Sequence, residues 1–148
     1  MKAFYHGGYY FVAPSMNIAC GIQADDVSCA IWSRSYKDRP RPKSCEYGMY
    51  WDSSAVYVEN GAVIDGICAT QGWPVHSVLQ SVNAPGTSKK NGASISWFGD
   101  TAKVPTISYG QAVRMGDFRC VVETSGVSCG NIKTKHGFKM SREALNIW

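Results

Sequence analysis

The sequence lacks most of the patterns that mark a membrane helix, a metal site or a cofactor-binding fold. No apolar run approaches the roughly 18 residues that a transmembrane helix needs, and Leu-rich stretches are missing. No Cys-x-x-Cys pair occurs, no histidine lies at metal-finger spacing from a cysteine, and no His-Glu-x-x-His pair is present. The P-loop and the Rossmann fingerprint are absent too. We therefore expect no bound metal and no cofactor.

Length and composition fit one domain of ordinary size. The 148 residues are 45% hydrophobic, which is typical of a folded chain, so we expect a single domain over residues 1–148. Aromatic and β-branched residues dominate the apolar set, and glycine is frequent. About eight to ten short apolar segments separated by turn residues predict an all-β or mostly β fold. The expected form is a small disulfide-stapled barrel or sandwich built from β-hairpins.

The charge balance is mildly basic. A net charge of +4 would help adhesion to an anionic surface such as a cell envelope, but it does not indicate nucleic-acid binding. Residues 1–14 contain Lys2 and several apolar residues, but His6, Gly7 and Gly8 interrupt any apolar core of a signal. We read this stretch as the start of the domain and expect any export signal to lie outside this sequence.

The cysteines are even in number, and four of them form a repeated frame. The stretch CGIQADDVSC runs from Cys20 to Cys29, and CVVETSGVSC runs from Cys120 to Cys129. Both frames end in Val-Ser-Cys, and both have turn residues at their centre. Each predicts a β-hairpin whose strands carry facing cysteines, at a distance that a disulfide can bridge. The repeat indicates either an old duplication or one stapled hairpin used twice.

The remaining cysteines pair by elimination. Cys45 and Cys68 enclose the stretch AVYVENGAVID, in which Asn60-Gly61 is the favoured pair of a type I′ hairpin turn. The six cysteines could serve metal or redox chemistry, or they could form structural disulfides. We prefer three structural disulfides, because short bridges within hairpins stabilise the fold without an evident reactivity. Such bridges indicate an oxidising compartment, so we expect an extracellular or cell-envelope protein.

Three other segments carry local signals. In residues 75–82, VHSVLQSV, the spacing of the apolar residues fits both a helix and a strand, and the sequence does not decide between them. Residues 83–94 read as a polar loop, and residues 106–110 and 111–120 as strands. The final stretch SREALNIW predicts a short C-terminal helical turn, with Ser141 as its N-cap.

Two ends of the chain resemble a known family. The stretch FVAPSMNIACGI is similar to the pattern F-x-S-P-S-G-N-I-x-C, and the stretches YGQAVRMGDFRCVVETSGVSC and HGFKMSREAL are similar to Y-G-x…F-x-C…G-V-x-C…G-H-G-F-x-x-S-R. Both patterns belong to a family of small exported actinobacterial proteins of unknown function. The resemblance covers residues 11–29 and 109–145, and it departs from the pattern at Ala13, Met16 and Lys135, where the family has Ser, Gly and Gly. It implies a secreted or lipid-anchored envelope protein and implies no activity.

Candidates for acid–base chemistry are few. His136 stands near Ser141 and could act as a general base or a ligand, but a turn histidine that packs or hydrogen-bonds is the preferred interpretation. A half-buried strand residue explains His76 at least as well as such a role does. The neighbouring carboxylates Asp25 and Asp26 would point apart on a strand or turn, so a solvated turn is preferred to an acid–base pair.

An aromatic patch and a basic connector are the candidates for binding. Tyr47, Tyr50 and Trp51 could form a platform for a glycan or a protein, although core and hairpin packing is the preferred interpretation. Arg39 and Arg41 lie in the Pro-rich stretch RPRP, which could contact anionic envelope polymers or an acidic partner. A solvated linker is the preferred alternative.

The sequence leaves three functional hypotheses. The first is a non-enzymatic secreted or envelope-associated module that binds an envelope protein or a cell-wall component, with a possible lipid anchor in the native protein and no nucleic-acid partner. The second is an inhibitor or immunity-type protein that blocks an exported enzyme through a rigid loop such as residues 83–94. The third is a small hydrolase, which would need His136 or His76 beside a carboxylate in a pocket.

Overall fold

Two large antiparallel sheets, one two-stranded hairpin and one helix make up the described part of the protein, which is seen here in a computed structural model. The structure describes residues 4–5, 8–46, 48–69, 74–83, 93–97 and 100–148. The first sheet has the strand order β1 (Phe4–Tyr5), β2 (Gly8–Val12), β3 (Ile18–Ile22), β4 (Val27–Ile31), β5 (Tyr50–Val58) and β6 (Ile64–Ala69). The second has the order β13 (Leu145–Ile147), β12 (Gly137–Met140), β11 (Gly126–Asn131), β10 (Phe118–Glu123) and β9 (Ala112–Met115). A separate hairpin joins β7 (Ala93–Trp97) to β8 (Asp100–Val104).

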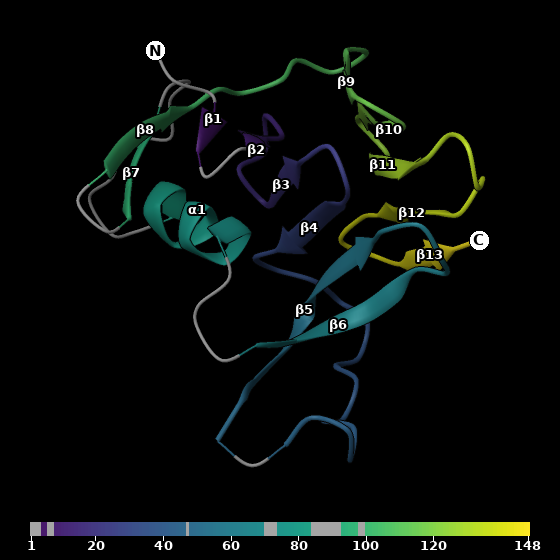
Figure 1. Cartoon of the computed structure of the whole chain (residues 1–148). Helices are drawn as coiled ribbons and strands as arrows, with labels where there is room; N and C mark the ends of the chain where they lie inside the picture. Colours follow the sequence, from purple (N-terminus) through teal and green to yellow (C-terminus); the bar gives the residue numbers. More distant parts are fainter. Residues whose placement is uncertain (1–3, 6–7, 47, 70–73, 84–92, 98–99) are drawn as a thin grey trace.

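Three layers result from this arrangement. The second sheet covers one face of the first sheet, and the helix α1 (Pro74–Asn83) covers the other (Figure 1). Strands β3 and β4 lie in the middle layer, and every one of their residues is buried. The expected β-rich, disulfide-stabilised fold is confirmed, and of the two forms considered it is a sandwich.

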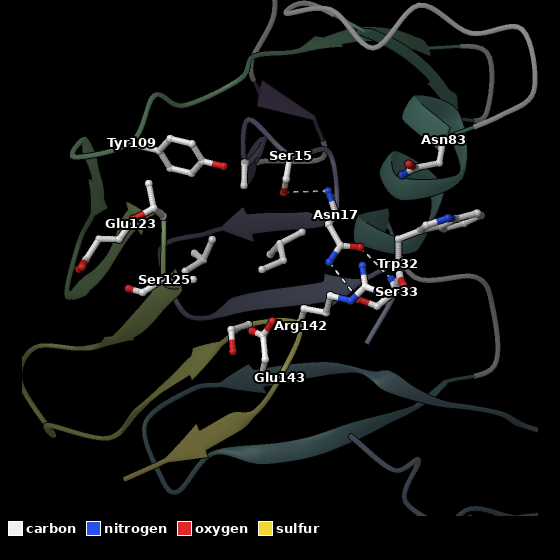
Figure 2. Close-up of a pocket in the computed structure, with 16 residues that line it drawn as sticks. Ser15, Asn17, Trp32, Ser33, Asn83, Tyr109, Glu123, Ser125, Arg142 and Glu143 are labelled. Carbon is white, nitrogen blue, oxygen red and sulfur yellow. Dashed lines mark hydrogen bonds between the residues drawn. The ribbon is translucent and has the colours of Figure 1, made fainter. Parts of the chain in front are cut away.

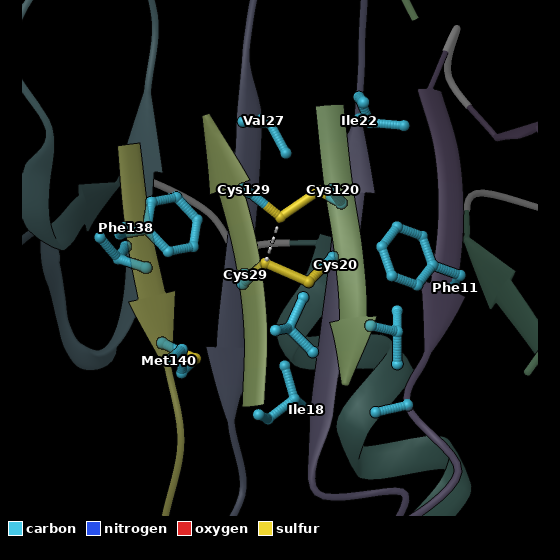
Figure 3. Close-up of a cluster of buried hydrophobic side chains, with 14 of the residues drawn as sticks. Phe11, Ile18, Cys20, Ile22, Val27, Cys29, Cys120, Cys129, Phe138 and Met140 are labelled. Carbon is cyan, nitrogen blue, oxygen red and sulfur yellow. Dashed lines mark hydrogen bonds between the residues drawn. A yellow bond between two sulfur atoms is a disulfide. The ribbon is translucent and has the colours of Figure 1, made fainter. Parts of the chain in front are cut away.

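The two repeated hairpins pack against each other at the centre of the sandwich. Cys20 lies directly opposite Cys29, and Cys120 directly opposite Cys129, with 4.1 Å between the Cα atoms in each pair. Strand β10 lies over β3 and β11 over β4, so that the two disulfides meet in the core (Figure 3). The Sγ atoms of Cys29 and Cys129 are 3.5 Å apart. The repeated sequence frame is therefore also a repeated layer of the core.

The third disulfide ties a loop to the edge strand. Cys45 and Cys68 are bonded, the pairing that elimination predicts, with 5.6 Å between their Cα atoms. The turn inside this loop differs from the expected type I′ turn, because β5 and β6 stop pairing at Tyr57 and Ile64. Neither Asn60 nor Gly61 has the positive φ that a type I′ turn requires. The hairpin closes instead through the longer loop 59–63.

Residues 75–82 form a helix, which the sequence left undecided. Val75, Val78, Leu79 and Val82 recur at the spacing of one helix face, and all four side chains are buried against the first sheet. His76 consequently lies on a helix, and its expected place on a strand is wrong. None of the helical segments described has the length and apolar character that crossing a membrane requires.

Three predictions of local structure are wrong, because strand pairing or a turn replaces the expected element. The C-terminal helical turn is wrong: Leu145–Ile147 forms β13, which pairs with β12, and Ser141 accepts a hydrogen bond from Ala144 N at 3.2 Å within a turn. The single long strand expected over residues 111–120 is broken by a turn at Gly116, where φ is 58°. The strand expected over residues 106–110 is reduced to one bridge between Thr106 and Val12.

Two left-handed residues occupy notable positions. Among the described residues, Met16 and Lys135 are the non-glycine residues with positive φ, at 60° and 66°. These are the two positions at which the resembling pattern has glycine and this chain has another residue. A side chain there costs backbone energy that glycine avoids. Met16 is buried beneath α1 and offsets the cost by packing, whereas Lys135 is exposed and has no such compensation.

The β3–β4 turn carries an acidic group whose ionisation opposes folding. Burial raises the pKa of Asp26 from 3.8 to about 6, and the charges of Asp25 and Glu59 add to the rise. When the pKa of a carboxyl group is higher in the folded state than in the unfolded state, ionisation of that group destabilises the folded protein, and its protonated form does not. Its contribution to stability is therefore full below about pH 4 and is lost as the pH rises to about 6.

We expect Asp26→Asn to stabilise the protein at neutral pH. The gain should be about 1 kcal/mol at pH 7, a value reduced for solvent screening because Asp26 is only half-buried. At about pH 4 the variant and the wild type should have nearly the same melting temperature. Melting curves of both proteins across this pH range provide the measurement. A difference that does not change with pH would assign the effect to packing rather than to charge.

Candidate functional site

A groove opens at one end of the sandwich, and we call it the end groove. It encloses about 460 Å³ and lies between the β2–β3 turn on one side and the β10–β11 turn on the other (Figure 2). Residues 141–143 complete its wall. The lining residues come from separate parts of the chain, so only the folded state assembles them.

The β2–β3 turn is braced by one amide side chain. Asn17 accepts a hydrogen bond from Ser33 N at 2.8 Å and donates one to Ser33 O at 2.9 Å. The backbone N–H of Trp32 donates to Asn17 O at 2.8 Å. These bonds hold Trp32 at the edge of the groove, where its side chain is 50% exposed.

The helix end fastens the same turn from the other side. Asn83 donates from Nδ2 to Met16 O and to Leu79 O, each at 2.9 Å. The first bond ties α1 to the left-handed residue of the β2–β3 turn, and the second satisfies a carbonyl at the end of the helix. The turn that carries Ser15 and Asn17 is thus held by both the sheet and the helix.

The opposite wall is equally fixed. Gly110 N donates to Val122 O at 2.7 Å, which positions the preceding Tyr109 with 44% of its surface exposed. Gly126 has φ 139°, and a Cβ there would lie 2.5 Å from Met140 O, so the β10–β11 turn approaches the next strand as closely as glycine allows. Ser35 N donates to Arg142 O at 2.8 Å and anchors the remaining wall.

The chemistry of the end groove suits recognition. Trp32 and Tyr109 stand at opposite ends, and Arg142 lies between them (Figure 2). The lining also offers the hydroxyl groups of Ser15, Ser33, Thr124, Ser125 and Ser141. No histidine or cysteine is among the described residues that line it, and Glu123 points away from its centre in Figure 2. The arrangement presents aromatic faces, hydroxyls, one guanidinium and the carboxyl group of Glu143.

The aromatic and basic residues predicted from the sequence lie elsewhere. The Trp51 indole packs against Gly66, and its Nε1 donates to Arg39 O at 3.0 Å. The Arg39 side chain forms an ion pair with Asp65. Tyr50 is exposed at the start of β5, and Tyr47 lies outside the described residues.

The connector is fastened to the β5–β6 hairpin rather than freely solvated. Arg41 donates from Nε to Cys45 O at 3.0 Å and from its guanidinium to Glu46 O. Arg34 bonds to Ser53 Oγ at 3.0 Å and pairs with Asp38. Binding by these residues stays a prediction, and the contacts seen here are structural.

His76 is the one predicted histidine that lies beside a carboxylate. Its Nδ1 is 3.4 Å from Asp52 Oδ2, and Ser54 Oγ donates to the other oxygen of Asp52. The neighbouring Asp52 carboxylate raises the pKa of His76, although burial lowers it. Burial alone would raise the pKa of Asp52, but the nearby His76 and the hydrogen bonds from Ser54 bring it below its usual value. Asp52 therefore lies between Ser54 and His76. In a serine catalytic triad the histidine lies between the serine nucleophile and the carboxylate, so these three residues do not form one.

No Gly-x-Ser-x-Gly nucleophile elbow is expected from the sequence, but its residue spacing does occur. Residues 126–130, GVSCG, have the spacing of the Gly-x-Ser-x-Gly nucleophile elbow. The elbow places serine on a sharp turn between a strand and a helix, whereas Ser128 lies within β11 and pairs with Val121 and Lys139. The spacing therefore arises from the stapled hairpin and does not form an elbow.

Sequence reasoning also missed the exposed aromatic residues of the end groove. Tyr109 lies within a stretch that carries the family resemblance, but nothing in the sequence places it near Trp32. No protein-family model, curated protein or solved structure matches the chain.

Proposed function

We propose that this protein is a non-enzymatic accessory module of the cell envelope that binds a protein partner through the end groove. The observation that carries the proposal is the exposure of Trp32, Tyr109 and Arg142 around one groove. Tryptophan, tyrosine and arginine are the residue types that dominate binding hot spots. Large exposed aromatic side chains cost solubility, so their grouping at one hollow favours a binding role.

The rigidity of the groove supports the same proposal. Its walls are held by hydrogen bonds from Asn17, Asn83 and Gly110, and the sheets behind it are joined in the core by two touching disulfides. A surface that is ordered before binding loses little conformational entropy when the partner arrives. Such a groove suits recognition by fixed anchors.

Location and resemblance agree with this role. Three disulfides fit a protein of an oxidising compartment, and the expected place is the cell envelope or its exterior. Each stretch that resembles the family of small exported actinobacterial proteins contributes to the groove, through Ser15, through Tyr109 and Ser125, and through Ser141. The inhibitor hypothesis invoked residues 83–94, of which 84–92 lie outside the described residues, and it stays a prediction.

The test is capture of the partner with matched variants. We expect immobilised wild-type protein to retain one protein from a detergent-solubilised envelope of the source organism. The double variant Trp32→Ala/Tyr109→Ala should retain at least about tenfold less, because two anchors are lost. Tyr50→Ala is the control, since Tyr50 is 67% exposed but lies outside the groove. Equal losses in both variants, or unchanged capture by the double variant, would remove the end groove from the proposal.

A further inference from the structure

A second groove lies on the outer face of the second sheet, and we call it the outer groove. It encloses about 400 Å³ over β10 and β11, on the side of these strands that faces away from the core. Its floor includes Gly130, which pairs directly with Gly137 on β12. Gly130 has no side chain and is part-exposed, so the backbone of β11 is accessible at this place, whereas Gly137 is buried.

Trp148 forms a fixed aromatic wall of the outer groove. The backbone N–H of Trp148 donates a hydrogen bond to Gly137 O at 3.0 Å, and the backbone N–H of Gly137 donates one to Trp148 O at 3.2 Å. A Cβ on Gly137 would lie 3.0 Å from the indole atoms Cε2 and Cζ2, so the ring packs on the glycine. The side chain is nevertheless 54% exposed. One part of the indole is therefore held by the sheet, and the rest faces solvent.

The rim of the outer groove is positively charged. Arg119 and Lys135 supply the charge, and Arg119 lies directly opposite Arg114 on β9. His136 lines the groove beside them, with its Nδ1 3.4 Å from Trp148 O. Like charges that face each other across two strands destabilise a sheet. Over the described part of the chain, no ion pair within 4.0 Å compensates Arg114, Arg119 or Lys135. The described residues thus leave this charge without an ion-pair partner.

The position of Lys135 is set by a rigid turn. Asn131 is buried, and its Oδ1 accepts hydrogen bonds from Lys133 N at 2.9 Å and Thr134 N at 3.1 Å. Its Nδ2 donates to Glu59 O at 3.0 Å, which anchors the turn to the first sheet. Lys135 N donates to Asn131 O at 2.8 Å. Lys135 is thus held at φ 66° with its side chain exposed, a conformation that costs energy and is typical of functional positions.

We propose that the outer groove binds an acidic polysaccharide. The exposed indole offers a flat face on which the C–H groups of a sugar ring can pack, because the centre of an aromatic face is electron-rich. Arg119 and Lys135 stand beside it to pair with the acidic groups of the same chain. The floor at Gly130, which has no side chain, leaves room for a polymer that passes along the sheet. This site is separate from the end groove and does not depend on the function proposed for it.

The test uses defined polymers and single substitutions. Binding of the full chain to heparin, to polygalacturonate and to neutral dextran is measured by calorimetry at about 150 mM salt, so that weak long-range attraction is screened. We expect binding to an acidic polymer and none to dextran. Comparison of heparin with polygalacturonate tells whether sulfate or carboxylate groups are preferred, and binding to either supports the proposal. Equal binding to dextran, or binding to neither acidic polymer, would overturn it.

Substitutions locate the site. Trp148→Ala and Arg119→Gln should each weaken binding by about tenfold or more, whereas Lys43→Gln removes one exposed charge far from the groove and should not. Lys135→Gly removes the charge while it relieves the left-handed backbone, so weaker binding with unchanged or higher melting temperature would exclude misfolding as the cause. Equal effects of Arg119→Gln and Lys43→Gln would reduce the binding to net charge and overturn the proposal. Tighter binding of a single-stranded oligonucleotide of equal charge would do the same.

Discussion

Replacement of Cys120 and Cys129 together by alanine is expected to lower the free energy of unfolding by about 3–5 kcal/mol. The bridge closes a short loop, with a sequence separation of 9, and the loss of that constraint alone accounts for about 2.5–3 kcal/mol. The rest comes from packing. Both sulfur atoms are buried, and Cys129 Sγ lies 3.5 Å from Cys29 Sγ, so two alanines leave space against the partner disulfide.

The peripheral disulfide provides the matched comparison. Cys45 and Cys68 have a sequence separation of 23, and loop entropy alone predicts a larger loss for them, about 3.5 kcal/mol. Cys68 is only half-buried, however, and its removal disturbs no central contact. Urea unfolding of both double-alanine variants separates the two causes. We expect the Cys120/Cys129 variant to be the less stable, and the opposite order would mean that the touching disulfides contribute little beyond loop closure.

Gly66→Ala is the single substitution with the largest expected effect, a loss of about 2–4 kcal/mol. Gly66 has φ 92°, and a Cβ there would lie 2.1 Å from Trp51 Cη2. The left-handed backbone alone costs a non-glycine residue about 1–2 kcal/mol. In addition the indole must move, which breaks its bond to Arg39 O and loosens the connector that ends at Cys45.

Gly61→Ala is the control for this substitution. Gly61 lies in the loop of the same hairpin, its φ is not in the left-handed range, and an added Cβ meets nothing within 4 Å. We expect a change within about 0.5 kcal/mol. Thermal unfolding measures both variants, and a shift in tryptophan emission should accompany Gly66→Ala alone. If the two variants melt together, Trp51 does not pack on Gly66 as described.

Local sequence patterns predicted the centre of the fold well. The frames at residues 20–29 and 120–129 hold turn residues between cysteines at equal distances, and facing cysteines fix the register of a hairpin without any knowledge of the rest. The local sequence could not decide between a helix and a strand at residues 74–83, because its apolar residues fit both patterns. Their packing against the first sheet is what selects the helix. The C-terminal segment failed for the same reason. Ser141 is a reasonable N-cap, but pairing of β13 with β12 prevails.

The end groove could not be predicted, because its walls lie far apart in the sequence. Trp32 follows a buried strand and Tyr109 lies in a turn, and each alone reads as an ordinary surface residue. The packing of β10 over β3 and of β11 over β4 brings them to one hollow. The aromatic patch at Tyr50 and Trp51 was the stronger local signal, yet Trp51 serves the hairpin that it packs on.

The central claim is that a protein partner occupies the end groove, and site-specific photo-crosslinking in the envelope tests it most directly. A photoreactive phenylalanine analogue replaces Ser125 inside the groove in one variant and the exposed Lys43 outside it in another. We predict that the Ser125 variant forms one discrete crosslinked protein product and that the Lys43 variant does not form it. The same product from both positions, or a product from the Lys43 position alone, would contradict the account.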